Sequence, residues 1–478
     1  MKEHRNLWII GLIATLALII IPLAIFLPKE ATAATDPWAG VPERPIHTDH
    51  TFLLKGPYES GEDVTHACLE CHPDAAEEMM QTTHWTWESD PVQLPGRDEP
   101  VTVGKKNQIN NFCIGIQGNW QKCTTCHAGY GWADETYFET ATEDNVDCLV
   151  CHADTGTYAK GDYGDPLVGV DLLSAAQSVG VPKRQNCGSC HFDGGGGNGV
   201  KHGDLDESLD IPTASIDVHM GEFDFICIDC HQTEDHQIKG RSISVSLDDK
   251  NQIYCTDCHG EDLHEDERLN AHIQTVACQA CHIPAFALED PTKMDWDWST
   301  AGQDIGDDPH VYLKIKGSFV YEKNVQPEYY WYNGLADRYL LGDPIAEDGP
   351  TPINYPQGDI NDPNAKIMPF KIHRAKQIYD TVNKILLQPK TVGEGGYWTE
   401  FDWDLAAKLG SEITGLPYSG SYGFADTIMF WPTTHMVQSA SEALECVACH
   451  SENGRLNWEA LGYPGDPIEW GGRFSNDN

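Results

Sequence analysis

The chain has 478 residues, of which 31 are Lys or Arg and 74 are Asp or Glu, so its formal net charge at pH 7 is −43. A surface with this charge repels polyanions, and we therefore exclude nucleic acid as a partner. The composition also includes 17 cysteines, and their spacing carries most of the functional interpretation.

The N-terminus comes first in chain order and has the features of an export signal. Lys2 and Arg5 precede an apolar run over residues 7–27, and Ala31, Thr32 and Ala33 then form a small-x-small cleavage pattern. The run is also about long enough to span a bilayer, so an uncleaved membrane anchor is the alternative to cleavage. We expect residues 1–34 to be the signal peptide or anchor and residues 35–478 to be periplasmic or otherwise extracytoplasmic.

The next feature is the pattern C-x-x-C-H, which occurs eight times. Cysteines three apart on one helical turn present both sulfurs to one edge of a porphyrin, and the histidine after them reaches the iron. Zinc sites also use C-x-x-C pairs but need no histidine after each pair. The pattern predicts eight covalently bound haem c groups, held by Cys68, Cys71 and His72; Cys123, Cys126 and His127; Cys148, Cys151 and His152; Cys187, Cys190 and His191; Cys227, Cys230 and His231; Cys255, Cys258 and His259; Cys278, Cys281 and His282; and Cys446, Cys449 and His450.

The motif spacing also indicates the fold class. Seven motifs fall within residues 68–282 and leave room for only one helix or loop between neighbours. We expect a mainly α domain over 35–478 with much irregular structure and a few short β-hairpins, organised around a continuous chain of eight haems. The alternation of apolar residues predicts a hairpin over 242–254 and strands over 311–321 and 329–332. The segment 283–445 carries no motif, and we expect it to cover the haems and to end in a helix over 439–446.

The remaining histidines are candidates for the sixth position on each iron. An iron with two histidine ligands suits electron transfer, whereas an iron with a labile or absent sixth ligand can bind a substrate. Thirteen histidines lie outside the motifs. We favour nine of them as distal ligands: His50, His84, His202, His219, His236, His264, His272, His373 and His435.

A lysine is a further candidate for an iron ligand, provided that desolvation or the metal lowers its pKa. Lys201 follows the glycine run 194–197, and glycines let a backbone approach a flat porphyrin closely. The alternative is a solvated lysine on a flexible surface loop.

Several segments together resemble the octahaem tetrathionate reductase family. They are residues 110–113 (Asn-Asn-Phe-Cys), 129–132 (Gly-Tyr-Gly-Trp), 146–152, the glycine-rich loop before Lys201, and 418–420 (Tyr-Ser-Gly), and the similarity runs from about His50 to Tyr463. In that family one haem has lysine in place of a distal histidine and is the reactive centre, with a cysteine and an aspartate nearby.

Matched by motif, the resemblance implies that the second haem, held by Cys123, Cys126 and His127, is the reactive one. Its lysine is then Lys201 and its cysteine is Cys113, with Lys160 as the reserve candidate for the lysine. The family's aspartate falls at Asn198 in this chain, which leaves the substrate range open. Judged as an unpaired cysteine alone, without the resemblance, Cys113 is equally compatible with a buried apolar side chain and with a reactive thiolate.

Three functions follow from these features. The first is a reductase that relays electrons to the lysine-ligated haem and reduces tetrathionate, nitrite or hydroxylamine. The second is a non-catalytic electron-transfer conduit in extracytoplasmic respiration, and the third is an oxidase of the hydroxylamine type. The partners expected are redox proteins, either quinol-linked or other cytochromes, and a small inorganic substrate.

Overall fold

The computed structural model describes residues 12, 15, 16, 36, 38–94, 96–105, 107–109, 115–243, 247, 250–260 and 263–473. The chain divides into two compact units, Met1–Pro42 and Glu43–Asn478. Most of the expected signal segment, and Cys113, lie outside the described residues. Among the residues that are described, no helix combines the length and apolar character needed to cross a membrane.

The second unit contains many short helices. Their bounds are α2 (Gly61–Leu69), α3 (Ala75–Met80), α4 (Thr83–Thr86), α5 (Trp120–Cys123), α6 (Tyr137–Thr140), α7 (Leu149–His152), α8 (Leu172–Gln177), α9 (Arg184–His191), α10 (Val218–Glu222), α11 (Cys227–Cys230), α12 (Glu267–His272), α13 (Cys278–His282), α14 (Tyr397–Glu400), α15 (Trp403–Thr414), α16 (Cys446–Cys449) and α17 (Pro467–Trp470). Single 3-10 turns lie at η1 (Thr124–Cys126), η2 (Glu143–Asn145), η3 (Asp162–Gly164), η4 (Glu207–Leu209), η5 (Cys255–Asp257) and η6 (Trp298–Thr300).

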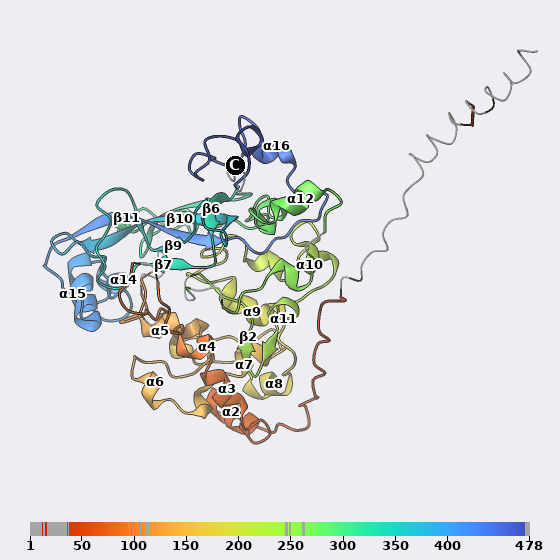
Figure 1. Cartoon of the computed structure of the whole chain (residues 1–478). Coiled ribbons are helices and arrows are strands. Elements are labelled where there is room, and N and C mark those ends of the chain that lie inside the picture. Colours follow the sequence, from red (N-terminus) through yellow and green to blue (C-terminus); the bar gives the residue numbers. More distant parts are fainter. Residues whose placement is uncertain are drawn as a thin grey trace, which may run out of the picture. The chain divides into compact units, whose positions relative to one another are not determined.

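Side-chain caps fix the start of six helices: α2, α8, α10, α12, α15 and α17. At the start of α2, the Ser60 hydroxyl accepts from Asp63 N at 3.2 Å while the Asp63 carboxylate accepts from Ser60 N at 3.1 Å. Each C-x-x-C-H motif lies on or beside such a helical turn, as expected for two sulfurs that must face one edge of a porphyrin. Figure 1 shows α2 to α9 gathered at one end of this unit, away from the long strands.

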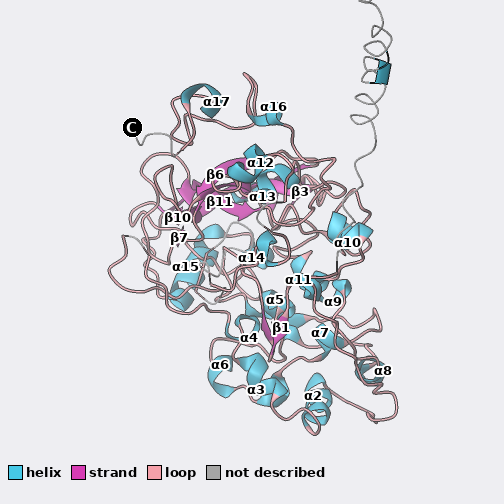
Figure 2. Ribbon diagram, turned by 45° about the vertical axis from the view of Figure 1, so that its right-hand side comes forward, coloured by secondary structure: helices cyan, strands magenta, loops and turns pink. Residues whose placement is uncertain are grey.

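The strands of the second unit are β1 (Thr233–Glu234), β2 (Gln237–Ile238), β3 (Thr292–Asp297), β4 (Tyr312–Leu313), β5 (Gly317–Glu322), β6 (Glu328–Tyr332), β7 (Ala336–Arg338), β8 (Thr351–Pro352), β9 (Asn354–Pro356), β10 (Lys366–Asp380) and β11 (Tyr422–Pro432). Seven of them form one mixed sheet in the order β4-β5-β3-β10-β11-β8, with β6 also paired to β10. Strand β10 runs antiparallel to β11 from Phe370↔Pro432 to Asp380↔Tyr422. Figure 2 shows these strands together in one half of the unit.

The sheet is the main departure from the expected fold. The pairing of β10 with β11 joins segments about 50 residues apart, and a local pattern does not reveal it. The strand expected over 329–332 is present as β6, whereas the one expected over 311–321 is divided by a turn into the antiparallel strands β4 and β5. No strand forms at the described residues of 242–254, and the small hairpin is instead β1-β2.

The helix expected over 439–446 was also wrong. Residues 439–445 form turns, and the helical turn α16 begins only at Cys446. Leu444 N donates to Cys281 O at 3.0 Å, so this segment bonds to the previous motif instead of to itself. The last motif is therefore held against the seventh by backbone contact.

Candidate functional site

Six motif histidines each face a second histidine. Two imidazoles that share one metal ion stand roughly 6 Å apart between ring centres, because each nitrogen binds at about 2 Å. The ring centres are separated by 6.3 Å for His50 and His72, 6.2 Å for His84 and His191, 6.0 Å for His219 and His259, 6.3 Å for His231 and His435, 6.3 Å for His264 and His282, and 6.1 Å for His272 and His450. These six pairs fit an iron between them.

Hydrogen bonds hold many of these rings by Nδ1, which leaves Nε2 for a metal. The Nδ1 atoms lie 2.8 Å from Lys239 O for His231, 2.6 Å from Arg268 O for His272, and 2.6 Å from the Asp466 carboxylate for His450. His435 lies against the buried Asp204, 3.3 Å from its carboxylate. Burial favours the neutral acid, but the bond to His435 holds the pKa of Asp204 at about 2, so its carboxylate is charged.

The cysteines bring neighbouring motifs into one series. Numbered in chain order, motifs 1 and 3, 2 and 4, 4 and 5, and 6 and 7 each bring two cysteine sulfurs close to one another: Cys68 and Cys148, Cys126 and Cys190, Cys187 and Cys227, and Cys255 and Cys278. Cys151 also lies near Cys187, Cys230 near Cys258, and Cys281 near Cys449. Motifs 1, 3, 4, 5, 6, 7 and 8 thus follow one another in space, and motif 2 joins at motif 4.

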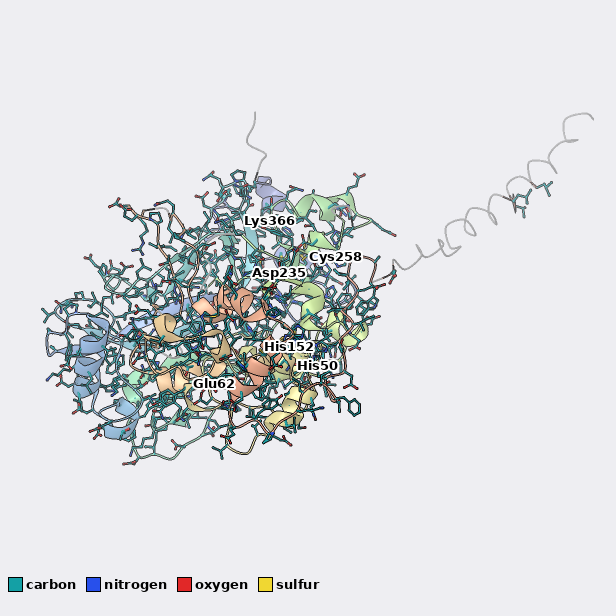
Figure 3. All side chains as sticks on the ribbon, turned by 90° about the horizontal axis from the view of Figure 1, so that it is seen from below. His50, Glu62, His152, Asp235, Cys258 and Lys366 are labelled. Carbon is teal, nitrogen blue, oxygen red and sulfur yellow. The ribbon has the colours of Figure 1, made fainter. Side chains whose placement is uncertain are left out.

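Two histidines, His47 and His236, are candidates for the distal ligand opposite His152 in the third motif. The His47 ring centre lies 6.4 Å from that of His152 and 5.1 Å from that of His50. The charge of His236 also reaches His152, while His236 Nδ1 lies 2.8 Å from the Glu78 carboxylate. Figure 3 shows His50 and His152 close together. Sequence reasoning missed His47, because its signal was only its proximity to His50 along the chain.

The second motif differs from the others. Among the described residues, no histidine ring is in ring contact with His127; instead the Trp87 ring centre lies 3.3 Å away and that of Trp132 6.0 Å away. Burial, followed by the charges of Lys105 and Lys160, lowers the pKa of His127 well below its usual value. His127 therefore packs against tryptophan rings, and the charges of two lysines and of His84 reach it.

Lys160 is fixed in a buried ion pair. Its Nζ lies 2.9 Å from the Asp147 carboxylate, with only 4% and 0% of the two side chains exposed. Nζ also donates to Gly129 O at 3.1 Å and to His127 O. Tyr130 and Tyr158 donate to the same carboxylate at 2.7 and 3.0 Å, so Asp147 and the Lys160 Nζ are held in fixed positions next to the motif.

Lys201 lies on the glycine-rich loop, whose backbone is hydrogen-bonded to strand β10. Its Nζ is 5.0 Å from the centre of the Trp431 ring, and its charge reaches His191 and His202. On β10, the buried Lys371 donates to Val200 O at 3.0 Å, Lys201 O at 3.2 Å and the Thr292 hydroxyl at 2.5 Å. The loop therefore has a rigid support.

The two other favoured histidines near this support are buried in it. The His202 ring packs edge-on against Trp431 at 4.5 Å. His373 is fully buried in the middle of β10, opposite Met429 in the strand register. The structure thus places His373 within the sheet, and His202 beside the sheet where the charges of His191 and His435 reach it.

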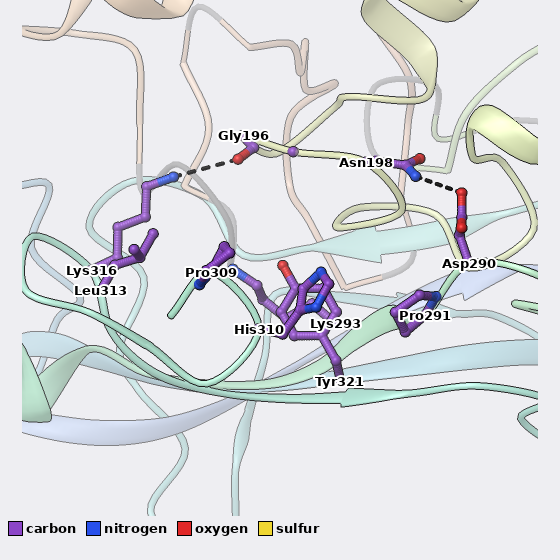
Figure 4. A pocket seen from close by; sticks show the side chains of 11 residues that line it. Gly196, Asn198, Asp290, Pro291, Lys293, Pro309, His310, Leu313, Lys316 and Tyr321 are labelled. Atoms are coloured by element: carbon purple, nitrogen blue, oxygen red, sulfur yellow. Dashed lines mark hydrogen bonds between the residues drawn. The ribbon is translucent and has the colours of Figure 1, made fainter. Parts of the chain in front are cut away.

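Asn198 lies at the edge of a cavity of about 210 Å³, next to the same loop (Figure 4). Its amide donates to the Asp290 carboxylate at 2.7 Å, and its carbonyl oxygen accepts from Glu207 N at 2.8 Å. Lys293, which is 2% exposed, also lines the cavity, with its Nζ 3.5 Å from the centre of the Phe319 ring. Asn198 thus presents an amide where the family resemblance implies an acid, with a carboxylate beside it.

Known proteins resemble the chain at several levels. Residues 110–192 match the family "Cytochrome c7 and related cytochrome c", and residues 293–453 match "Cytochrome c bacterial". An uncharacterised protein of Archaeoglobus fulgidus is 24% identical over 228 residues, which are 37% of this chain and 76% of that protein. The crystal structure of octaheme cytochrome c from Shewanella oneidensis is 50% identical and superposes with a TM-score of 0.83, over 88% of this chain and 98% of that one.

Proposed function

Because the chain belongs to the octahaem c-type cytochromes, we propose that it relays electrons to one reactive haem, bound at Cys123, Cys126 and His127, and there reduces a small inorganic compound. As a member of this family it is a multihaem redox protein with covalently bound haem c. Eight haems, one at each motif, follow from the eight C-x-x-C-H patterns. Tetrathionate, nitrite and hydroxylamine are the substrates that we propose.

The observation that carries the proposal is the difference between His127 and the other motif histidines. Six of those face a second histidine at 6.0–6.3 Å, and His152 has His47 at 6.4 Å. Two imidazoles saturate an iron and favour electron transfer, whereas an iron without a second imidazole can accept a substrate. Within the described part of the chain, the ring contacts of His127 are with tryptophan instead, Trp87 at 3.3 Å and Trp132 at 6.0 Å.

Three lysines compete for the remaining position. The family resemblance favours Lys201, while the charges that act on His127 come from Lys105 and Lys160. A lysine ligand must bring its nitrogen to the iron, and the Lys160 Nζ is already held by the buried Asp147 carboxylate and by two backbone carbonyls. We therefore propose Lys201 as the ligand and Lys105 as the competing candidate, and we withdraw Lys160 to a supporting role.

Electron delivery makes use of the other motifs. Their cysteines bring each motif next to another, so the haems bound there form a continuous route that ends, or branches, at motif 2. The same continuity also supports the alternative function, a conduit without catalysis. With a net charge of −43, the protein suits a basic redox partner, and we place both in an extracytoplasmic compartment, where haem c is attached in prokaryotes.

Electron paramagnetic resonance of the oxidised, haem-loaded protein tests the reductase against the conduit. Spectra are recorded without substrate and with tetrathionate, nitrite or hydroxylamine. We expect the signal of one haem to change while the others stay as they were. If every haem signal is indifferent to all three compounds, the protein is a conduit.

Three matched variants then assign the lysine. Lys201→Leu should open one iron site and alter turnover, whereas Lys160→Leu should lower stability without changing the ligand of any iron. The third variant, Lys105→Leu, tests the competing candidate for the lysine ligand. A changed iron signal in Lys105→Leu with an unchanged one in Lys201→Leu would transfer the assignment to Lys105.

Cys113, which lies outside the described residues, separates sulfur chemistry from nitrogen chemistry. If its thiolate exchanges with a sulfur–sulfur bond, Cys113→Ser should remove most tetrathionate turnover, because a hydroxyl is a much weaker nucleophile. Reduction of nitrite and hydroxylamine should survive the change. Equal loss of all three activities together with stability would make Cys113 a packing residue.

A further inference from the structure

Arg338, at the end of β7, is a buried cation whose charge is not balanced by the described protein. Arg338 is 1% exposed, and its Nη2 donates to Ile109 O at 2.8 Å. Nε and Nη1 are buried and have no hydrogen-bond partner within the described residues. No carboxylate of those residues lies within ion-pair distance of it.

A second arginine nearby, Arg97, forms ion pairs with the neighbouring carboxylates. Arg97 lies 2.8 Å from the Asp343 carboxylate and 3.5 Å from that of Asp337, and the same Nη2 donates to Arg338 O at 2.8 Å. The Asp337 carboxylate also accepts from the backbone N–H of Arg338 itself at 2.8 Å. The two arginines therefore share one neighbourhood, in which Arg97 is neutralised and Arg338 is not.

Arg338 binds the chain segment that carries Lys105 and Ile109, and the charge of Lys105 acts on motif 2. Ile109, whose carbonyl it binds, follows Gln108, and the Gln108 amide nitrogen is likewise buried without a partner among the described residues. Lys105, on the same segment, is close enough for its charge to act on His127 and Cys126. Hydrogen-bond donors are thus left open on and next to the segment from which Lys105 acts on motif 2.

Open donors with a buried positive charge call for an anion. Burial of a charge without a counter-charge is strongly unfavourable, and a guanidinium binds two oxygens of one group through parallel N–H bonds. Although burial lowers the pKa of Arg338 to about 9, the side chain remains charged at neutral pH.

We propose that Arg338, with Gln108 beside it on the same segment, is the receptor for an anionic group with at least two oxygens at the motif 2 haem. Two sources share this chemistry. One is a propionate of that haem, and the other is a small oxyanion on its way to the iron. The placement of the anion at a reactive haem rests on the proposed function. The buried and unbalanced charge of Arg338 is independent of that function.

The test compares Arg338→Gln with Arg97→Gln in the haem-loaded full chain. Haem midpoint potentials are measured by spectroscopic titration in buffer without small coordinating anions, and nitrite affinity is measured by optical titration. If a propionate is bound, Arg338→Gln lowers the potential of one haem, because loss of a nearby positive charge favours the oxidised iron. A bound propionate leaves the nitrite Kd near that of wild type, whereas a site for a free oxyanion makes the nitrite Kd rise about tenfold or more in Arg338→Gln.

The inference is overturned if neither quantity departs from wild type, or if Arg97→Gln changes both in the same way. Should Arg338→Gln fail to fold, an experimental structure of the wild-type holoprotein decides. A propionate or free-anion oxygen in hydrogen-bond distance of Nε or Nη1 is the expected result, and protein carbonyls in that place contradict the proposal. The electron paramagnetic resonance test of the proposed function uses the wild-type protein and does not involve Arg338. The proposal for Arg338 can therefore fail while the proposed function stands, and the two failures are distinguishable.

Discussion

The motif-bearing segment 61–282 and the sheet-bearing segment 292–432 fill their interiors in different ways. Helices in the first are four to nine residues long, and its histidine pairs leave about 6 Å between ring centres. In the second, β10 and β11 pair over 11 residues, and Trp296 stacks on Trp298 at 4.4 Å while Tyr397 stacks on Trp403 at 3.7 Å. Helices this short are unstable alone, so we infer that haem completes the interior of the first segment beside its side-chain clusters around Trp132 and Leu149, whereas side chains alone fill the second.

The sharpest test of this difference is to produce the exported chain in cells that cannot attach haem. We expect nearly complete loss of ordered structure in 61–282, because the space between its histidines is then unfilled. Limited proteolysis with mass spectrometry of the fragments should show cleavage spread through that segment. The fragments that last longest should contain β10 and β11.

The holoprotein is the control for this experiment, and it should resist the protease in both segments. Equal resistance of the two segments in the haem-free chain would contradict the comparison. So would preferential cleavage between β10 and β11, because their ladder does not depend on haem.

A smaller effect is expected where the motif segment does have a core of its own, at the pair Lys160 and Asp147. Asp147→Asn leaves the lysine charge buried without its counter-charge, which costs about 3–5 kcal/mol. We expect a lower thermal unfolding midpoint and a disturbed spectrum of the motif 2 haem. The exposed pair Lys183 and Asp154 is the matched control, and Asp154→Asn should cost less than about 1 kcal/mol.

The sheet should respond to substitution without involving haem. Trp298 is 2% exposed and stacks on Trp296, so Trp298→Phe leaves a void in the aromatic core and should cost about 1–3 kcal/mol. All haem spectra should remain those of the wild type. A change in any haem potential would show that the two segments are coupled more closely than their separate cores imply. Trp470→Phe, at a residue that is 63% exposed, is the control and should have almost no effect.

The same contrast explains what could be predicted from sequence. Covalent attachment needs a short local pattern, and the eight motifs were visible in full. Partners of the motif histidines depend on three-dimensional placement: His50, His84, His219, His264, His272 and His435 lie opposite motif histidines, whereas His47 was overlooked. The sheet was missed because β10 mixes apolar with basic residues, and its burial comes from β11 and from loops distant in sequence. Arg338 had no signal at all, since only its surroundings make it unusual.

The smallest expected effect concerns Asn198, at the contact between the glycine-rich loop and the sheet segment. In Asn198→Asp a carboxylate replaces the amide that donates to Asp290 at 2.7 Å, and two carboxylates so close cannot both ionise easily. Asp206 already shows this environment, since burial and then the charge of Asp290, among others, raise its pKa to about 6. The new acid should therefore have a raised pKa in the folded protein.

A raised folded-state pKa sets the direction of the pH dependence. Below the unfolded-state pKa of about 4 the new acid is protonated in both states, can still donate to Asp290, and has little effect on stability. As pH rises through the folded-state pKa, the variant should lose about 1 kcal/mol relative to wild type. Thermal unfolding of both proteins at pH 4 and pH 8 measures this difference. The double variant Asn198→Asp with Asp290→Asn exchanges the charge and restores one donor facing one acceptor, so it should remove the pH dependence; if it does not, the contact between Asn198 and Asp290 is not the cause.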